Sequence, residues 1–241
     1  MRHVIVIFLL ICSLGLYVTT AMAEPFSLAT IALPPYGYSE KGQPKGLTYE
    51  LGNAIATEAG LTPTNSILPF ARAMEEIALG KVDAIIMFPN PTIDSCAENL
   101  GLVLPMETII LGRAGTPLRS LRDVRGKTLA TIRGAKYDDR ISKKNGIILY
   151  PTDSYSQSLK MLLAKRVDAV VGPKMGLYFT AKRDAIPKRA LGAPLVLSVA
   201  KGCFFLSNKV SDGQIRQRLI EAIERLKKNG TINALSAKYA L

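Results

Sequence analysis

The sequence predicts an α/β protein with two similar lobes, each a mixed, mostly parallel sheet flanked by helices. Apolar runs of strand length alternate along the chain with segments whose apolar residues have helical spacing. The run at residues 82–88 is nearly all apolar, which is typical of a strand buried on both faces of a parallel sheet. Two short motifs also recur in the same order, which indicates that the second part of the chain repeats the first.

In the first part of the chain, short apolar runs that stop at proline predict strands, and 3.6-residue spacing predicts helices. Leu51 and Ile55 share one helix face, and Gly60 follows as a helix end. The expected strands are residues 26–33, 67–68 and 82–88, and the expected helices are residues 47–59 and 71–79.

The second part continues the alternation. The last long helix opens with the capping pattern Ser211–Gln214 and closes at Asn229–Gly230. Its apolar stripe consists of Ile215, Leu219, Ala222 and Leu226. The other expected helices are residues 135–144, 156–164 and 176–182, and the expected strands are residues 128–132, 146–150, 167–171, 195–199 and 203–206.

The repeated motifs favour two lobes. The sequence LATI occurs at residues 28–31 and 129–132, and GKVDAII at 80–86 is echoed by KRVDAVV at 165–171. Shared β-propensity and chance offer a weaker explanation, because the order of strands and helices around the motifs also agrees. Two α/β lobes leave a cleft at the carboxyl ends of their strands, where ligands bind.

Residues 1–23 have the pattern of an export signal. A positive start precedes the apolar residues 4–18, and Ala21-Met22-Ala23 matches a signal-peptidase site, so cleavage is expected after Ala23. A membrane anchor is disfavoured because a spanning helix needs about 20 apolar residues. A lipoprotein acylated at Cys12 is disfavoured by the bulky Ile11 before it. The predicted location is the periplasm.

Composition excludes several functions. The single histidine, His3, falls in the predicted signal, so residues 24–241 have no Ser–His or Cys–His pair for nucleophilic catalysis. No metal and no cofactor are expected. The formal net charge is +12, but the basic residues are spread along the chain without interleaved aromatics, so we expect no nucleic-acid binding.

Cys96 and Cys203 form either one disulfide or two buried thiols.

Several motifs resemble one family in their order and spacing across some two hundred residues. They are LPPYGY at 33–38, GQPKGLTYEL at 42–51, LGKVDA at 79–84, LRDVRGKT at 121–128, KNG at 228–230 and KY at 238–239. The chain is similar to the periplasmic solute-binding proteins of the amino-acid class, solute-binding protein family 3, which serve bacterial ABC importers and have the type II periplasmic binding fold.

The resemblance implies a discontinuous first lobe. Residues 24–109 and 196–241 would form lobe 1, and residues 110–195 would form lobe 2. Both cysteines would then lie in lobe 1, which makes a Cys96–Cys203 disulfide geometrically possible. The resemblance also implies a monomer that closes on a small solute by a hinge motion and delivers it to a membrane permease.

The expected ligand site contains residues from both lobes. Tyr36 matches the aromatic residue of the family's cleft, and Tyr38 lies beside it, although a tyrosine here can also simply pack on the loop after Pro34 and Pro35. The residues Phe88, Asn90 and Thr92 follow a buried strand and should line the cleft, with Asn90 as a turn residue in the alternative.

Three ligand contacts of the family are changed in this sequence. Ser95 stands where the family has an arginine for the ligand's carboxylate, and Pro173 stands where it has an aspartate for the amine. The family's Gly-Thr pair is Gly134–Ala135 here. A standard amino-acid ligand is therefore not expected, and Pro173 and Gly134 are expected to line the cleft.

Other cations are candidates to replace the missing arginine. Arg72 lies in the first turn of a predicted helix, where it either points to solvent or holds an anion together with free backbone N–H groups. Arg133 directly follows the expected strand at 128–132, and Lys136 and Tyr137 lie in the next turn. If Arg72 binds the ligand, Arg72→Ala should weaken binding far more than it lowers the melting temperature.

The predicted function is capture of a small polar solute, amino-acid-like or carboxylate-bearing, for an ABC importer, without enzymatic activity. One alternative is a periplasmic enzyme similar to the cyclohexadienyl dehydratase that shares this scaffold. Glu107 and Asp153 are its candidate acid and base. The other alternative is a ligand-sensing partner of a signalling receptor.

Overall fold

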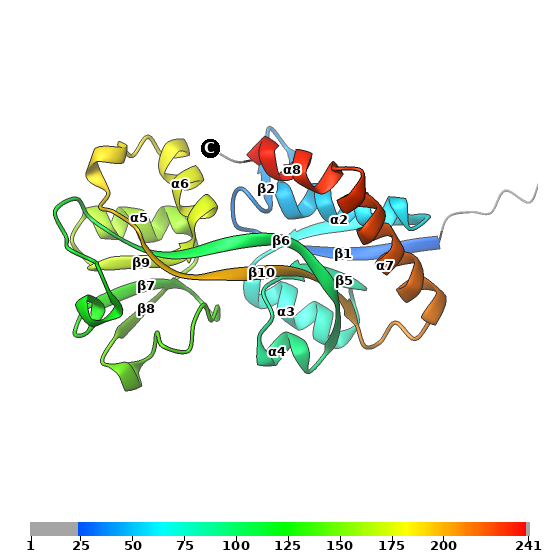
Figure 1. Ribbon diagram of the computed structural model, residues 1–241, viewed down its shortest axis with the longest axis horizontal. Coiled ribbons are helices and arrows are strands. Elements are labelled where there is room, and N and C mark those ends of the chain that lie inside the picture. Colours follow the sequence, from blue (N-terminus) through cyan, green and yellow to red (C-terminus); the bar gives the residue numbers. More distant parts are fainter. Residues whose placement is uncertain (1–23, 240–241) are drawn as a thin grey trace, which may run out of the picture.

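A single eight-stranded sheet runs the length of the molecule, in the order β4-β1-β5-β10-β6-β9-β7-β8 (Figure 1). The computed structural model describes residues 24–239, so the predicted signal peptide lies outside the described residues. The strands are β1 Glu24–Ile31, β4 Leu61–Leu68, β5 Ala84–Met87, β6 Ala97–Gly112, β7 Thr128–Ile132, β8 Ile148–Thr152, β9 Ala169–Pro173 and β10 Leu195–Ser207. A separate hairpin pairs β2 Tyr38–Glu40 with β3 Gln43–Lys45.

Helices cover both ends of this sheet. Around β1, β4 and β5 lie α2 Leu47–Glu58, α3 Phe70–Leu79, α4 Pro91–Asp94, α7 Gly213–Lys228 and α8 Thr231–Tyr239 (Figure 1). Around β7, β8 and β9 lie α5 Tyr155–Leu163 and α6 Lys174–Arg183. Three short 3₁₀ turns, η1 Leu121–Val124, η2 Lys143–Asn145 and η3 Lys188–Ala190, complete the secondary structure of residues 24–239.

The same strand arrangement occurs twice. In the first half, β1 is parallel to both β4 and β5, and in the second half β7 is parallel to both β8 and β9. The long antiparallel strands β6 and β10 pass through both halves, with β10 paired to β5 and β6 paired to β9. The predicted mixed, mostly parallel α/β architecture is confirmed. The predicted lobe boundaries at 109/110 and 195/196 fall inside β6 and at the first residue of β10, and they stay a prediction.

The repeated Val-Asp-Ala motif has the same structural role in each half. The Asp83 carboxylate accepts hydrogen bonds from the backbone N–H and hydroxyl of Ser27, both at 2.7 Å. The Asp168 carboxylate accepts one from the backbone N–H of Thr128 at 2.8 Å. Each aspartate directly precedes a buried strand and joins it to the parallel strand beside it. The apolar residues that follow are fully buried in both β5 and β9.

The prediction of a helix at residues 135–144 was wrong, because this segment is a loop that ends in η2. Local side-chain bonds stabilise the irregular backbone here. Arg140 pairs with Asp138, and the Asn145 side-chain amide donates to the carbonyl of Arg140 at 2.8 Å. The side chains of Tyr137 and Ile141 pack against a buried apolar cluster of the second half.

The expected strands at 195–199 and 203–206 are one strand, β10, and its partner β6 was missed. Both carry glycine or proline inside the strand, at Gly202 and at Pro105, which are weak strand formers. The pairing register between β6 and β10 shifts at several points, one of which lies between Val196 and Ser198. Helix α8 was not predicted either.

Candidate functional site

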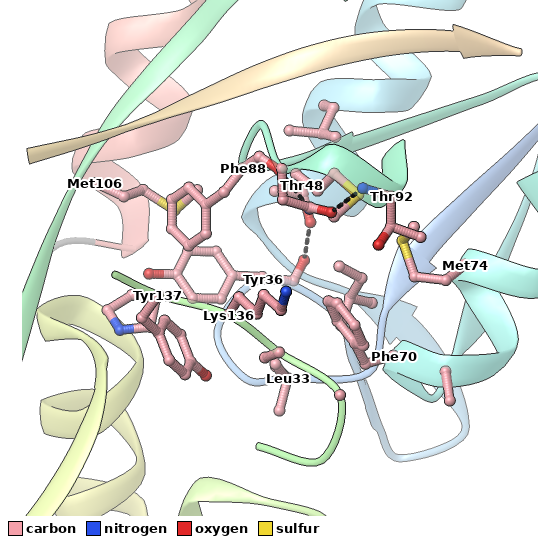
Figure 2. Close-up of a pocket in the computed structure, with 18 of the residues that line it drawn as sticks. Leu33, Tyr36, Thr48, Phe70, Met74, Phe88, Thr92, Met106, Lys136 and Tyr137 are labelled. Atoms are coloured by element: carbon pink, nitrogen blue, oxygen red, sulfur yellow. Dashed lines mark hydrogen bonds between the residues drawn. The ribbon is translucent and has the colours of Figure 1, made fainter. Parts of the chain in front are cut away.

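A cavity of about 280 Å³ lies between the two halves of the molecule (Figure 2). A volume of this size is at the small end of the range for ligand pockets. Its walls come from both halves, since they include Met74 and Phe88 of the first half and Tyr137 and Tyr155 of the second. A ligand held here would touch both halves at once.

Seven of the ten ligand residues predicted from the sequence line this cavity. They are Tyr36, Phe88, Asn90, Thr92, Gly134, Tyr137 and Pro173. Most of them lie just after the carboxyl end of a strand. Phe88 follows β5, Gly134 follows β7, and Pro173 is the last residue of β9. Strand β5 of the first half runs opposite to β7 and β9 of the second half, so their carboxyl ends face each other across the cavity.

Arg72, Arg133 and Tyr38 do not line the cavity. The guanidinium of Arg72 pairs with Glu76 of its own helix at 2.7 Å, and with Glu75 at 3.5 Å. Placed one turn ahead on α3, these carboxylates hold the arginine along the helix surface and raise its pKa.

The other two residues also have partners elsewhere. Arg133 is exposed and pairs with Asp153 at 2.9 Å. The ring of Tyr38 packs against Phe179 of α6, with 5.7 Å between ring centroids, and so joins the two halves outside the cavity.

Asn90 both lines the cavity and begins α4. Its side-chain oxygen accepts hydrogen bonds from the N–H groups of Thr92 at 3.1 Å and Ile93 at 3.3 Å. Its amide donates to the carbonyl of Phe88 at 3.1 Å. Asn90 is therefore the turn residue of the sequence alternative as well as a wall of the cavity. Thr92, at the cavity wall, keeps its hydroxyl free of any hydrogen bond within residues 24–239.

Three tyrosines gather where the cavity meets the second half. The hydroxyls of Tyr137 and Tyr155 are 3.2 Å apart. Burial raises the pKa of Tyr137 to about 12, although its hydrogen bond with Tyr155 opposes part of the rise. Burial raises the pKa of Tyr155 as well, and the nearby Tyr137 adds to the effect.

The third tyrosine, Tyr36, comes from the first half. It is buried, and its hydroxyl forms no hydrogen bond of normal geometry, although the backbone amide of Gly176 lies near it. Burial raises the pKa of Tyr36 above 10, so all three phenols stay neutral at physiological pH.

Phe70 and Tyr155 also line the cavity and were not indicated by the sequence. Lys136, which the sequence places beside the candidate Arg133, lines it as well. Lys136 is the only charged residue among those that line the cavity, and it forms no ion pair in the described part of the chain. Figure 2 shows its side chain among the lining residues. Lys136 follows Gly134 after β7, and Tyr155 follows the end of β8, so the rule of strand ends could have found both.

The candidate acids of the enzyme alternative lie outside the cavity. The carboxylate of Glu107 pairs with Lys174 at 2.5 Å, and that of Asp153 pairs with Arg133. Among residues 24–239 there is also no cluster of three metal-ligating side chains.

The disulfide prediction was wrong, because Cys96 and Cys203 are both free thiols in the structure. The Cys96 thiol is directed to the carbonyl of Thr92, at 3.4 Å, one turn back along the chain. The Cys203 thiol is buried in the apolar cluster of the first half. The alternative of two buried thiols is correct for Cys203, which is buried, while the Cys96 thiol is only half-buried. Burial raises the pKa of both thiols.

Two α/β halves joined by two long strands, with a cavity between them, define a two-lobed binding fold. The family model of bacterial extracellular solute-binding proteins, family 3, matches residues 28–241, and the chain belongs to this family. No helix among residues 24–239 has the length and apolar character to cross a membrane.

Known relatives agree with this assignment. The chain is similar to the probable amino-acid-binding protein YxeM of Bacillus subtilis (strain 168), with 26% identity over 212 residues that cover 85% of this chain and 79% of the relative. It is also similar to the amino-acid-binding protein AabA of Dichelobacter nodosus, with 22% identity over 214 residues that cover 86% and 84% of the two chains.

Solved structures with the same fold include an ancestral arginine-binding protein bound to arginine. The TM-score is 0.77 at 19% identity, and the match covers 90% of this chain and 98% of the other. A histidine kinase sensor domain similar to periplasmic binding proteins also has a TM-score of 0.77, at 20% identity, with 90% and 95% covered. At these identities the likeness shows the fold alone. It confirms the predicted type II periplasmic binding fold.

Proposed function

We propose that this chain is the extracytoplasmic solute-binding component of an ABC importer and that it captures a small carboxylate-bearing solute. Membership of the family and the names of the relatives support a binding role. The observation that carries the proposal is the cavity between the halves, lined from both sides. A solute that contacts both halves favours the arrangement in which they are closed over it.

The proposed ligand contacts are the seven predicted residues that line the cavity, together with Lys136. Phe88 and Tyr36 would cover the apolar part of the solute. Lys136 and the free hydroxyl of Thr92 would hold its carboxylate, since both donate hydrogen bonds.

The proposed motion is hinge closure about β6 and β10. These two strands pass through both halves of the sheet, so relative movement of the halves must bend them. A register shift between Val196 and Ser198 interrupts their ladder where β10 begins, which supports bending at this end. In this proposal the protein is exported, cleaved after Ala23, acts as a periplasmic monomer, and delivers its solute to a membrane permease.

Binding is favoured over catalysis by the surroundings of the candidate acids. An acid/base catalyst must reach a substrate in the cavity, but Glu107 and Asp153 are ion-paired away from the lining. Within residues 24–239, the side chains that line the cavity include no carboxylate.

The test is a thermal-shift screen of residues 24–241 against monocarboxylates, amino acids, dicarboxylates, sugar acids and polyamines. A ligand that binds only the folded state adds about 2.7 kcal/mol to stability at a hundredfold excess over Kd. We expect a rise in Tm with at least one carboxylate class and a smaller radius of gyration in small-angle X-ray scattering. Thr92→Val should weaken that shift. A screen with no shift for any class would overturn the proposal.

A further inference from the structure

The charged side chains that line the cavity do not match the two opposite charges of a zwitterionic amino acid. Among the described residues 24–239, the lining contains one cation, Lys136, and no carboxylate. Most of the remaining wall is apolar, and includes Leu33, Phe70, Met74, Phe88 and Met106. The lining therefore offers a positive partner to an anion but no negative partner to a cation.

The polar groups of the wall have the same bias. The oxygen of Asn90 already accepts two N–H bonds at the start of α4. The hydroxyl of Thr92 remains without a partner within residues 24–239, whereas the hydroxyl of Tyr36 is buried near the backbone amide of Gly176. The Thr92 hydroxyl can donate a hydrogen bond to a carboxylate.

An ammonium group on the ligand would be unfavourable in this setting. It would lose water without gaining a carboxylate partner, and it would lie in the same small cavity as the Lys136 ammonium. At the end of β9, Pro173 contributes a ring and no polar side chain to the wall. A carboxylate on an apolar body avoids both penalties. Its negative charge can pair with the Lys136 ammonium, and its apolar part can pack on the aromatic and methionine side chains of the wall.

We propose that the cavity selects a monocarboxylate with an aromatic or aliphatic body and no ammonium group, and that Lys136 determines this selectivity. This inference rests on the proposed function, because it names the solute class of the same cavity. The site discriminates against zwitterionic amino acids of the same carbon skeleton.

The experiment uses three compounds on one skeleton: 3-phenylpropionate, L-phenylalanine and 2-phenylethylamine. A second set, hexanoate, L-norleucine and pentylamine, replaces the ring by an alkyl chain. Isothermal titration calorimetry on residues 24–241 should give the tightest binding for the acid of at least one set. The matching zwitterion and amine should bind about tenfold or more weakly, because each brings an unpaired ammonium into the cavity.

Variants of Lys136 test its role. Lys136→Gln should weaken acid binding about tenfold while the melting temperature stays unchanged, because the exposed side chain has no partner to lose. Lys136→Glu should shift the preference toward the amine of the same set. Lys144→Gln is the matched control, because it removes one exposed cation of the same half that does not line the cavity.

The outcomes separate the two proposals. Tighter binding of the zwitterion than of the acid would overturn the present inference and leave the proposed function standing. Equal affinity of Lys136→Gln and the unchanged protein for the acid would remove Lys136 from the site. If no member of either set binds, this inference fails, and the wider solute screen then decides the proposed function separately.

Discussion

Tyr36 of the first half packs directly on Gly176 of α6 in the second half. A Cβ atom built on Gly176 would lie 3.3 Å from Cε2 of Tyr36 and 2.9 Å from Cε2 of Tyr155. Absence of a side chain at this position lets the two halves approach. The contact is local evidence that the structure has its halves together, with the cavity between them.

Gly176→Ala should therefore disturb the contact between the halves. The added methyl must displace the buried ring of Tyr155 or push Tyr36 away, and we expect a loss of about 1–3 kcal/mol in the free energy of unfolding. Urea denaturation measures this loss. With the solute from the screen bound, small-angle X-ray scattering should report a larger radius of gyration for this variant than for the unchanged protein. Gly213→Ala is the control, because a Cβ there meets nothing within 4 Å. Equal behaviour of the two variants would contradict the prediction.

Arg72→Ala should have little effect on ligand affinity. The structure pairs Arg72 with Glu75 and Glu76 on the surface of α3, and surface pairs contribute about 0–1 kcal/mol. We expect a change in Kd below about twofold, equivalent to about 0.4 kcal/mol. Calorimetric titration with whichever solute the screen identifies measures it. A large loss of affinity at unchanged melting temperature would restore the ligand-binding role expected from the sequence.

The stability of the protein should fall as the pH rises above 10. The pKa of Tyr137 is raised to about 12 in the folded state, so between pH 10 and 12 the folded state binds more protons than the unfolded state. Stability is full below pH 10 and decreases by up to about 1.4 kcal/mol per pH unit for this group.

Urea denaturation at pH 9 and pH 11 measures this decrease. Tyr137→Phe should reduce it, because phenylalanine has no proton to lose. Tyr150→Phe is the matched control, since Tyr150 is 44% exposed on β8. An identical pH dependence for the Tyr137→Phe variant would refute the buried-phenol explanation.

Residues 24–241 should contain two titratable thiols. Both cysteines are free in the structure, and Cys203 is only 3% exposed. In denaturant, a thiol reagent should label Cys96 and Cys203 fully without prior reduction. In the folded protein, Cys203 should react far more slowly than Cys96. An intact mass that corresponds to loss of two hydrogens would instead show the disulfide.

Sequence patterns predicted the elements that have strong local signals. The apolar stripe of Ile215, Leu219 and Leu226 predicted α7, and the apolar residues after Asp83 predicted β5. The repeated motif gave the two-fold arrangement, since Asp83 and Asp168 act alike in the two halves. The same patterns failed at residues 135–144, where side-chain bonds to the backbone outweigh helical spacing.

The candidate site was predictable to the extent that strand ends define it. Phe88, Gly134 and Pro173 could be placed because they end or follow strands that meet in one region. The directions of long side chains could not be predicted in this way. Arg72 and Lys136 both occur near strand or helix ends, but Arg72 has carboxylates one turn ahead on its own helix.

The α/β class, the two-fold repeat and the lack of histidine in residues 24–241 could be read from the sequence, because they depend on residue types and local spacing. The fold was needed to show that Lys136 is the one cation among residues 24–239 that lines the cavity, and that Cys96 and Cys203 are free thiols. These outcomes depend on which side chains from distant segments meet when the halves pack together. Such contacts depend on the packing of distant segments against one another and not on the periodicity of any one segment.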